Sequence, residues 1–506
     1  MGKPYFGKEK ILNRRLCIFS VLFLILAGCA YTPQPVRSPY LDDDTPAGRC
    51  ADFFAALDQE LKQAGIRDPG EFRLKNHPYL RINRFLASFA TEIDEATAFD
   101  DWISRLQRLD QKARVFEIAN LPPKNLANLQ FKIGETDIRK EISQCGDILK
   151  AVDFADGDQR EKFMTDVNPF DDYLLLRRIL GLYPITSMFV ASGIYRYQSD
   201  VYRTFSNQPP PGWQKIRYVP AVVNDLQPSP SDILKTVGRD AIGIPEYSSK
   251  DQQILFDFFA PVWEVQTQGS FDRIGAPFWT ADKTPAIDTK RPVSFQRLSF
   301  SRFEGKILTQ LNYVVWFPAR PKEGALDIYG GLLDGLIYRV TLDNDGQALL
   351  YETVHNCGCY HKLYPTDRLQ VLKKIDYAEK PLVLKVPAAE PDSARMVIAL
   401  ETRTHYVKSL YALPRELNTA AVSYAFADYD QLRSLKYAEG ENRSFFGEDS
   451  IVPGSERLER YLLWPTGVLS PGAMRQWGRH SVAFVGKRHF DDPNLIEKIF
   501  QRVDLH

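Results

Sequence analysis

The spacing of apolar residues divides the chain into a helical stretch and a strand-rich stretch. In residues 50–65, CADFFAALDQELKQAG, apolar side chains recur at steps of three and four residues and a glycine ends the pattern, as expected of an amphipathic helix. The segments INRFLASFATEIDEA, FDDWISRLQRLDQKARVF and IRKEISQCGDILKAV repeat this period. They predict an all-α domain of four or five helices over residues 49–166.

After about residue 250 the apolar runs become short and are bounded by turn residues. LNYVVWF, GLIYRVTL, ALLYETV, PLVLKV, ARMVIAL and SVAFVG are typical of β-strands. The sequence therefore predicts an α+β fold, with the helical N-terminal domain followed by a strand-rich domain over residues 250–506. Residues 167–249 are expected to form a mixed connecting region, in which the short run ITSMFVASGIY packs in the core rather than contacting a membrane.

One hairpin can be placed residue by residue. Asp345 and Gly346 separate two strand-like runs, and such a dipeptide favours a two-residue turn in which both residues have positive φ. Opposed residue numbers then sum to 691, which places Arg339 opposite Glu352, a pair of opposite charge that supports the register. The expected core face carries Tyr338, Val340, Leu342, Leu349 and Tyr351.

The outgoing strand leads into HNCGCYH, which places two histidines and two cysteines within seven residues. Because side chains alternate along a strand, all four donors point to one face if the strand continues. A straight strand cannot bring all four to one ion, but a bend at Gly358 could gather them. The candidate metal ligands are His355, Cys357, Cys359 and His361.

Three roles for this segment remain open. The donor types suit zinc or copper, and with an open coordination position Asp334, predicted to lie opposite Cys357, is a candidate base for hydrolysis. The two cysteines could instead exchange disulfides, with a histidine favouring the thiolate. In the third alternative they form an inert structural pair. The other histidines of this half, His405, His480 and His489, are expected to be ordinary hydrogen-bonded side chains.

The sequence does not decide whether the protein is an enzyme. It contains no GxSxG elbow, P-loop or glycine-rich dinucleotide fingerprint. APVWEV, DRIGAPFW, YVVWFPARP, LDGLIYRVTL and HNCGCYH resemble segments of uncharacterised proteobacterial envelope proteins, and this resemblance implies no substrate. A non-enzymatic envelope protein that binds a protein or glycan partner is a further alternative.

The N-terminus has the features of a secretory signal peptide. Five basic residues precede an apolar run from Leu16 to Gly28, too short to span a bilayer comfortably. The residues Leu26-Ala27-Gly28-Cys29 resemble the lipobox of bacterial lipoproteins. This resemblance implies that residues 1–28 are removed and that Cys29 carries the lipid that anchors the protein to a membrane.

The residues after Cys29 refine this localisation. Ala30 follows rather than an aspartate, which by resemblance to Gram-negative lipoproteins implies the outer membrane, with the protein facing the periplasm. The proline-rich, acidic residues 29–48 are typical of an extended tether.

Charge and cysteine content set further bounds. The chain has 64 basic and 64 acidic residues, and removal of residues 1–28 leaves 59 and 63, so there is no basic field to attract nucleic acid. Of the six cysteines, Cys17 leaves with the signal peptide and Cys29 is lipidated. Cys50 and Cys145 lie in the helical region, and in an oxidising envelope they are predicted to form a disulfide between its first and last helices.

Overall fold

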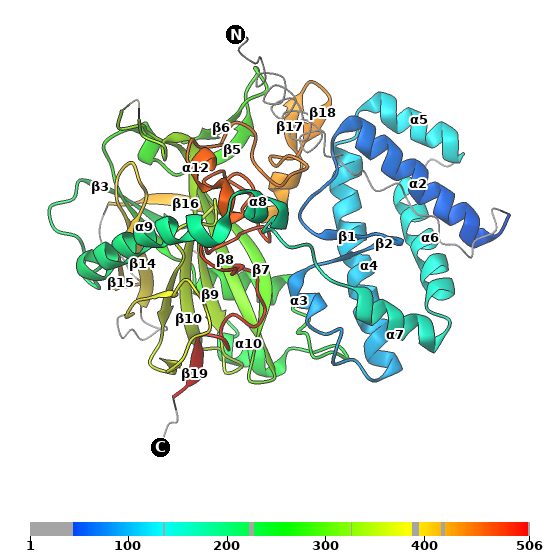
Figure 1. Ribbon diagram of the computed structural model, residues 1–506, viewed down its shortest axis with the longest axis horizontal. Helices are drawn as coiled ribbons and strands as arrows, with labels where there is room; N and C mark the ends of the chain where they lie inside the picture. Colours follow the sequence, from blue (N-terminus) through cyan, green and yellow to red (C-terminus); the bar gives the residue numbers. More distant parts are fainter. Residues whose placement is uncertain are drawn as a thin grey trace, which may run out of the picture.

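The computed structural model describes residues 44–134, 137–221, 227–324, 326–386, 394–415 and 420–503. Helices predominate in the N-terminal half, and a large curled sheet fills the C-terminal half (Figure 1), which confirms the predicted α+β class. The predicted lipobox and Cys29 lie outside the described residues. Among the described helices, none combines the length and the apolar character needed to cross a membrane.

The helices begin and end where local signals place them. Helix α2 begins after Thr45, whose hydroxyl accepts a hydrogen bond from the Gly48 amide at 3.0 Å, and it ends at Gly65, which adopts a left-handed conformation. The described helices are α2 (Pro46–Ala64), α3 (Arg84–Ala87), α4 (Ala96–Ala119), α5 (Pro123–Ile133), α6 (Ile138–Asp153), α7 (Gly157–Asp166), α8 (Leu175–Leu180), α9 (Tyr183–Thr204), α10 (Pro230–Thr236), α11 (Ser249–Phe258) and α12 (Arg460–Leu463), with 3-10 turns η1 (Ser270–Asp272), η2 (Tyr429–Arg433) and η3 (Trp464–Thr466).

The prediction of an all-α region was wrong in one place. A hairpin of β1 (Phe72–Leu74) and β2 (His77–Ile82) lies among the helices, and of the predicted helix INRFLASFATEIDEA only the four residues of α3 and the final Ala96, which begins α4, are helical. Strand β2 contacts α2, α4 and α6, so its consecutive residues Tyr79, Leu80, Arg81 and Ile82 are all buried. A short apolar run of this kind does not distinguish strand from helix by its period.

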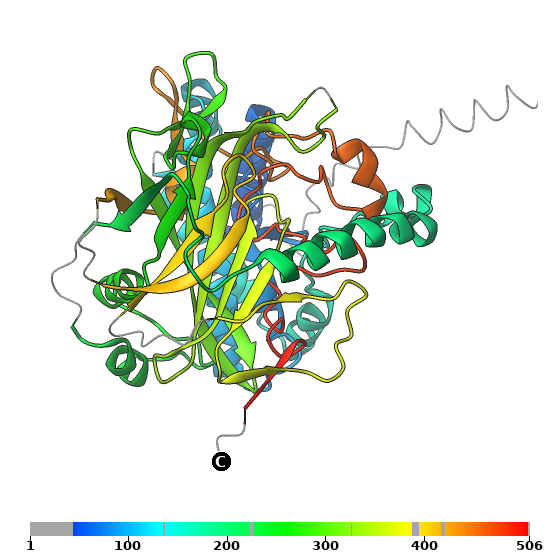
Figure 2. The same cartoon turned by 90° about the vertical axis from the view of Figure 1, so that its left-hand side faces the viewer.

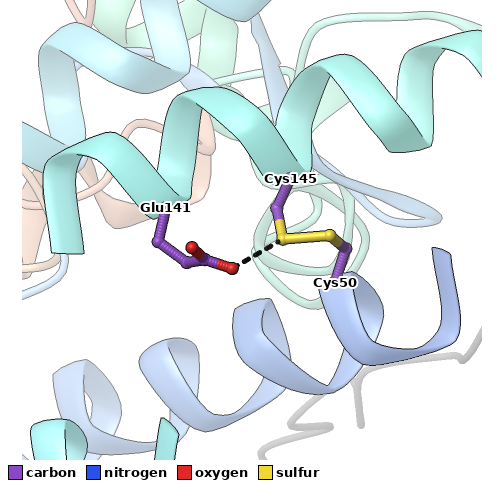
Figure 3. Close-up of side chains that lie close together, drawn as sticks. All are labelled: Cys50, Glu141 and Cys145. Atoms are coloured by element: carbon purple, nitrogen blue, oxygen red, sulfur yellow. Dashed lines mark hydrogen bonds between the residues drawn. A yellow bond between two sulfur atoms is a disulfide. The ribbon is translucent and has the colours of Figure 1, made fainter. Parts of the chain in front are cut away.

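Cys50 of α2 and Cys145 of α6 form a disulfide (Figure 3), the pairing predicted from the sequence. The bond joins helices that pack side by side, and the Cα atoms are 5.0 Å apart. The carboxylate of Glu141 lies 3.3 Å from the sulfur of Cys145. Both sulfurs are bonded to each other, so this group offers no thiolate to a metal ion.

The main sheet has eleven strands in the order β13-β11-β10-β9-β8-β7-β16-β3-β4-β14-β15. Most neighbours are antiparallel, while β11 with β13, β7 with β16, β16 with β3, and β4 with β14 are parallel. Its strands are β3 (Lys215–Pro220), β4 (Val262–Gln266), β7 (Val293–Phe303), β8 (Lys306–Arg320), β9 (Gly331–Leu342), β10 (Ala348–His355), β11 (Lys362–Pro365), β13 (Leu382–Val383), β14 (Ala394–Leu400), β15 (Val407–Pro414) and β16 (Val422–Asp428).

The remaining strands form three small two-stranded sheets beside the β1–β2 hairpin. They pair β5 (Ala276–Trp279) with β6 (Pro285–Asp288), β12 (Leu369–Val371) with β19 (Phe500–Arg502), and β17 (Leu435–Ala438) with β18 (Glu441–Arg443). The C-terminal strand β19 therefore pairs with β12, which lies about 130 residues earlier in the sequence.

The hairpin of β9 and β10 has the predicted register but not the predicted turn. Arg339 lies opposite Glu352 and donates to both of its carboxylate oxygens at 2.6 Å. The Asp343 amide bonds to the Gln347 carbonyl, leaving three residues in the loop, and of these only Gly346 has positive φ. The extra residue shifts the register next to Ala348, so Leu349 packs in a different cluster from the rest of the predicted core face.

We expect the Cys50–Cys145 disulfide to stabilise the helical half, because it closes a long loop and so limits the conformations of the unfolded chain. A sequence separation of 95 residues gives a chain-entropy contribution of roughly 4.7 kcal/mol on the loop-closure model. The double change Cys50→Ser and Cys145→Ser should lower the free energy of urea unfolding by about this amount. Reductant should destabilise the parent chain and leave the double variant unchanged; an unaffected parent chain would contradict the expectation.

Candidate functional site

The HNCGCYH segment is a tight turn, not an extended strand. Strand β10 ends at His355, whose amide bonds to the Cys359 carbonyl at 3.1 Å, while the Gly358 amide bonds to the His355 carbonyl at 2.7 Å. Gly358 (φ 90°) and Tyr360 (φ 60°) both adopt left-handed conformations. The chain therefore reverses here and returns as β11, so the strand does not continue through the segment and the alternative of a bend at Gly358 holds.

The turn sends the four predicted metal ligands to different places. The Nδ1 atom of His355 lies 3.4 Å from Asp334, and the Nε2 atom of His361 lies 3.1 Å from Glu352. Cys357 and Cys359 pack in an apolar cluster that includes Val354 and Val482. Within the described part of the chain, the only group of three or more histidine, cysteine or acidic ligand atoms within 4.8 Å of one another is the disulfide-bonded Cys50, Cys145 and nearby Glu141.

Cys357 and Cys359 are both free and buried. The Cys359 amide donates to the Cys357 sulfur at 3.4 Å. The hydrogen bond with Cys357 and, after it, burial raise the pKa of the Cys359 thiol well above its ordinary value. Because thiolate is the nucleophile in disulfide exchange, this environment disfavours redox chemistry and suits two small apolar side chains.

A buried chain of acids and histidines lies beneath the turn, and sequence reasoning did not find it. His405 places its Nδ1 atom 2.9 Å from Asp334 and its Nε2 atom 3.4 Å from Asp272, while Asp334 also meets His355. Asp334 therefore contacts two histidines rather than lying opposite Cys357 as predicted. The four residues come from distant parts of the sequence, and no spacing pattern connects them.

The charges in this chain support one another. Burial alone would raise the pKa of Asp334, but hydrogen bonds with His355 and His405 hold it well below its ordinary value. Burial would likewise lower the pKa of His405, but hydrogen bonds with Asp272 and Asp334 raise it. The two carboxylates therefore favour the imidazolium form of His405, whose ring stacks on Phe317 with the centroids 3.9 Å apart.

A cavity of about 530 Å³ lies on the other side of the turn. Gly358, Cys359, Tyr360 and His361 form part of its wall, and α9, α12 and the segment 481–484 form others. Arg320, Tyr406 and Glu459 place polar groups in the lining, as do Gln198, His361, Glu379 and Arg488. The turn therefore shapes the wall of a cavity.

Next to this cavity the protein exposes a large apolar surface, which we call the apolar face. It consists of side chains from α8, α9, α12 and η3, and α9 stands out along the side of the sheet (Figure 2). Phe189 is 77% exposed and Met188 is 72% exposed, so the prediction that ITSMFVASGIY packs in the core was wrong. The exposed members are Leu175, Leu176, Ile179, Leu180, Leu182, Ile185, Met188, Phe189, Tyr195, Tyr202, Tyr461, Leu462 and Trp464.

The polarity of α8 is inverted relative to that of an ordinary surface helix. Arg178 points inward and donates to the carbonyl oxygens of Thr466 and Gly486, each at 2.7 Å. Arg177 donates to the Val468 carbonyl at 3.3 Å. The leucines and isoleucine of the same helix point outward instead. Ordinary amphipathic helices place apolar side chains inward and charged ones outward.

Comparisons with known proteins give no relative. No protein-family model matches the chain, and no curated protein or solved structure matches it at a significant level. A function can therefore be inferred only from the geometry of the turn, the cavity and the apolar face.

Gly358 is expected to be essential to the turn. An alanine there would be strained at φ 90°, and its Cβ would lie 2.6 Å from the Ser481 carbonyl oxygen. Gly440→Ala is a matched control, because Gly440 has φ 73° and open space around its added Cβ. We expect the control to lose about 1 kcal/mol of unfolding free energy and Gly358→Ala to lose roughly 2 kcal/mol more. Equal losses in urea unfolding would show that the close contact with Ser481 is unimportant.

Thiol counting tests the environment of Cys357 and Cys359. In the folded chain without Cys29 we expect both thiols to react slowly with a disulfide reagent, because they are buried and the thiolate is disfavoured. Both should react at once after unfolding. Elemental analysis of the same sample should find no stoichiometric zinc or copper. Fast reaction in the folded state, or metal lost upon Cys357→Ser with Cys359→Ser, would contradict this interpretation.

Proposed function

We propose that the protein is a lipid-anchored envelope protein that acts on the surface of a membrane, which it contacts both through lipid on Cys29 and through the apolar face. The observation that carries the proposal is the inverted polarity of α8, together with the exposed apolar side chains of α9. An amphipathic surface of this kind lies in the interface of a bilayer with its apolar side in the lipid. The lipobox-like sequence and Ala30 support an outer-membrane location.

Several features favour a bilayer over a partner protein as the occupant of the apolar face. Most of its side chains are aliphatic, and Tyr195, Tyr202, Tyr461 and Trp464 lie among them. Tyrosine and tryptophan are enriched at the interface between a membrane and water. From Ile179 to Tyr195 the sequence has no charged residue. This run would therefore place no charged side chain in the lipid, where removing a charge from water is costly.

The length of chain before the described residues fits the same arrangement. Fifteen or so residues separate Cys29 from Asp44, and fully extended they reach at most about 50 Å. A lipid on Cys29 would therefore keep the protein close to the bilayer, within reach of a second, protein-borne contact. The apolar face supplies such a contact.

The geometry supports the metal and redox alternatives less well. The turn separates the four donors, and Cys359 is held as a thiol. A structural role for Cys357 and Cys359 in a membrane-associated interaction protein agrees better with their packing.

Vesicle flotation tests the proposal. The unacylated chain from residue 30 onward retains every described residue, and we expect it to float with phosphatidylethanolamine–phosphatidylglycerol vesicles. Phe189→Ser should lower vesicle partitioning roughly tenfold, because burying a phenylalanine contributes about 1.5–3 kcal/mol. Phe131→Ser in α5 is the matched control, since Phe131 is 91% exposed but lies away from the apolar face.

Three results would contradict membrane docking. The unacylated chain could stay at the bottom of the gradient, Phe189→Ser could float like the parent, or Phe131→Ser could lose as much binding as Phe189→Ser. Size-exclusion chromatography of the same samples identifies the rival occupant: a dimer that Phe189→Ser dissociates would assign the apolar face to a second copy of the chain.

A further inference from the structure

The cavity beside the HNCGCYH turn combines apolar walls with two charged side chains that form no ion pair with any described residue. Phe189, Val190 and Ile194 of α9 and Leu462 of α12 supply apolar wall. Its volume of about 530 Å³ is in the range of small-molecule sites, roughly 300–1,000 Å³. A site of this composition suits a ligand that is mostly hydrocarbon with one polar end.

Arg320 is the first of these polar groups. Both terminal nitrogens of its guanidinium lie 3.3 Å from the hydroxyl of Tyr406, and the group stacks over the rings of Tyr406 and Tyr329. No carboxylate of a described residue lies within 4.0 Å of the Arg320 guanidinium, the distance limit for an ion pair. A guanidinium presents a planar fork of donors that matches a carboxylate or phosphate, so Arg320 can take an anion.

Glu459 is the second. Only 5% of the residue is exposed, and its carboxylate lines the cavity without a hydrogen bond or ion pair to any described residue. An unpaired carboxylate at such depth is costly when charged. Burial raises the pKa of Glu459 to about 7, against the lowering effect of Arg457, Arg320 and Arg475. Near neutral pH the group can therefore donate a proton in a hydrogen bond.

We propose that the cavity binds a single-chain amphiphile whose anionic head group lies at Arg320 and Glu459 and whose chain lies against α9. Arg320 would supply the positive charge, and protonated Glu459 would donate a hydrogen bond to the same head group. The chain would replace water along the apolar wall, where burial of hydrocarbon is favourable. The cavity adjoins the apolar face through α9 and Leu462, so the ligand would reach it from the lipid side.

The pH dependence follows from the groups around Glu459. Arg457, Arg475, Arg320 and Asp327 face it, and the nearby thiol of Cys359 and hydroxyls of Tyr329 and Tyr360 have raised pKa values and stay neutral. Glu379, on another wall, accepts hydrogen bonds from the Phe484 and Val485 amides. As pH rises through about 7, Glu459 loses its proton and adds a negative charge beside the anionic head. Affinity should therefore fall with rising pH.

Calorimetric binding to the unacylated chain tests this site without vesicles, so it does not depend on membrane docking. The probes are dodecanoate, a lysophosphatidylglycerol of the same chain length, and dodecanol, each as monomers. We expect both anions to bind at least tenfold more tightly than dodecanol, because a hydrogen bond to a charged group contributes roughly a factor of ten or more. The tighter anion identifies the head group as carboxylate or phosphate.

Three variants separate the contributions. Arg320→Met should remove the preference for anions, and Glu459→Gln should remove the fall in affinity between about pH 6 and pH 8. Gly193→Leu should block the chain of all three probes, because Gly193 lines the cavity and an added Cβ there meets open space, so folding is unaffected. Circular dichroism confirms that each variant is folded.

Equal binding of dodecanol and dodecanoate, or unchanged binding in Arg320→Met, would overturn the assignment of an anionic head group. Absence of binding for all three probes, or full binding in Gly193→Leu, would overturn the cavity as the site. A pH step that persists in Glu459→Gln would overturn the role of Glu459. Flotation with vesicles in the same protein would then still support membrane docking, which keeps the two proposals separable.

Discussion

The inward attachment of Arg178 is the interaction on which the apolar face depends. Its guanidinium donates to two backbone carbonyls and stacks between Tyr173 and Tyr183, with ring-centroid distances of 4.7 and 4.3 Å. Gly181 completes the contact, because a Cβ there would lie 2.5 Å from the Pro465 ring. With Arg177 and Arg178 both bonded to backbone carbonyls, α8 presents its apolar side chains outward, and it leads directly into α9.

The apolar face and the cavity are consequences of one arrangement. Helix α9 is covered on only one side: its C-terminal end packs on the sheet through Tyr197 and Val201, and its N-terminal end contacts η3 and the segment 484–486. The outer side forms the apolar face, and the inner side closes the cavity over the HNCGCYH turn. Gly358 lets that turn pack against the Ser481 carbonyl, and the buried chain of Asp272, His405, Asp334 and His355 supports it from below.

Features governed by local physics could be predicted from the sequence. The period of α2, its end at Gly65, the Cys50–Cys145 pair and the Arg339–Glu352 register each depend on a few neighbouring residues or on one cross-strand pair. The turn between β9 and β10 was mispredicted by one residue because Asp345 does not take the positive φ that a two-residue turn requires.

The site itself depends on contacts that sequence spacing does not encode. Asp272, Asp334, His355 and His405 come from separate elements and meet only in the folded sheet. The direction in which α9 faces is set by Arg178 and the segment after α12, far along the chain. The apolar run ITSMFVASGIY has the same composition whether it is buried in the core or exposed at the surface, so only the structure separates the two cases.

Photo-crosslinking in cells tests the central claim most directly. A benzophenone amino acid at position 189 places a reactive group on the apolar face, and the same group at position 131 serves as the control on α5. Docking on a bilayer predicts that irradiation joins phospholipid to position 189 and none to position 131. Crosslinking of position 189 to a protein, or to nothing, would contradict the account.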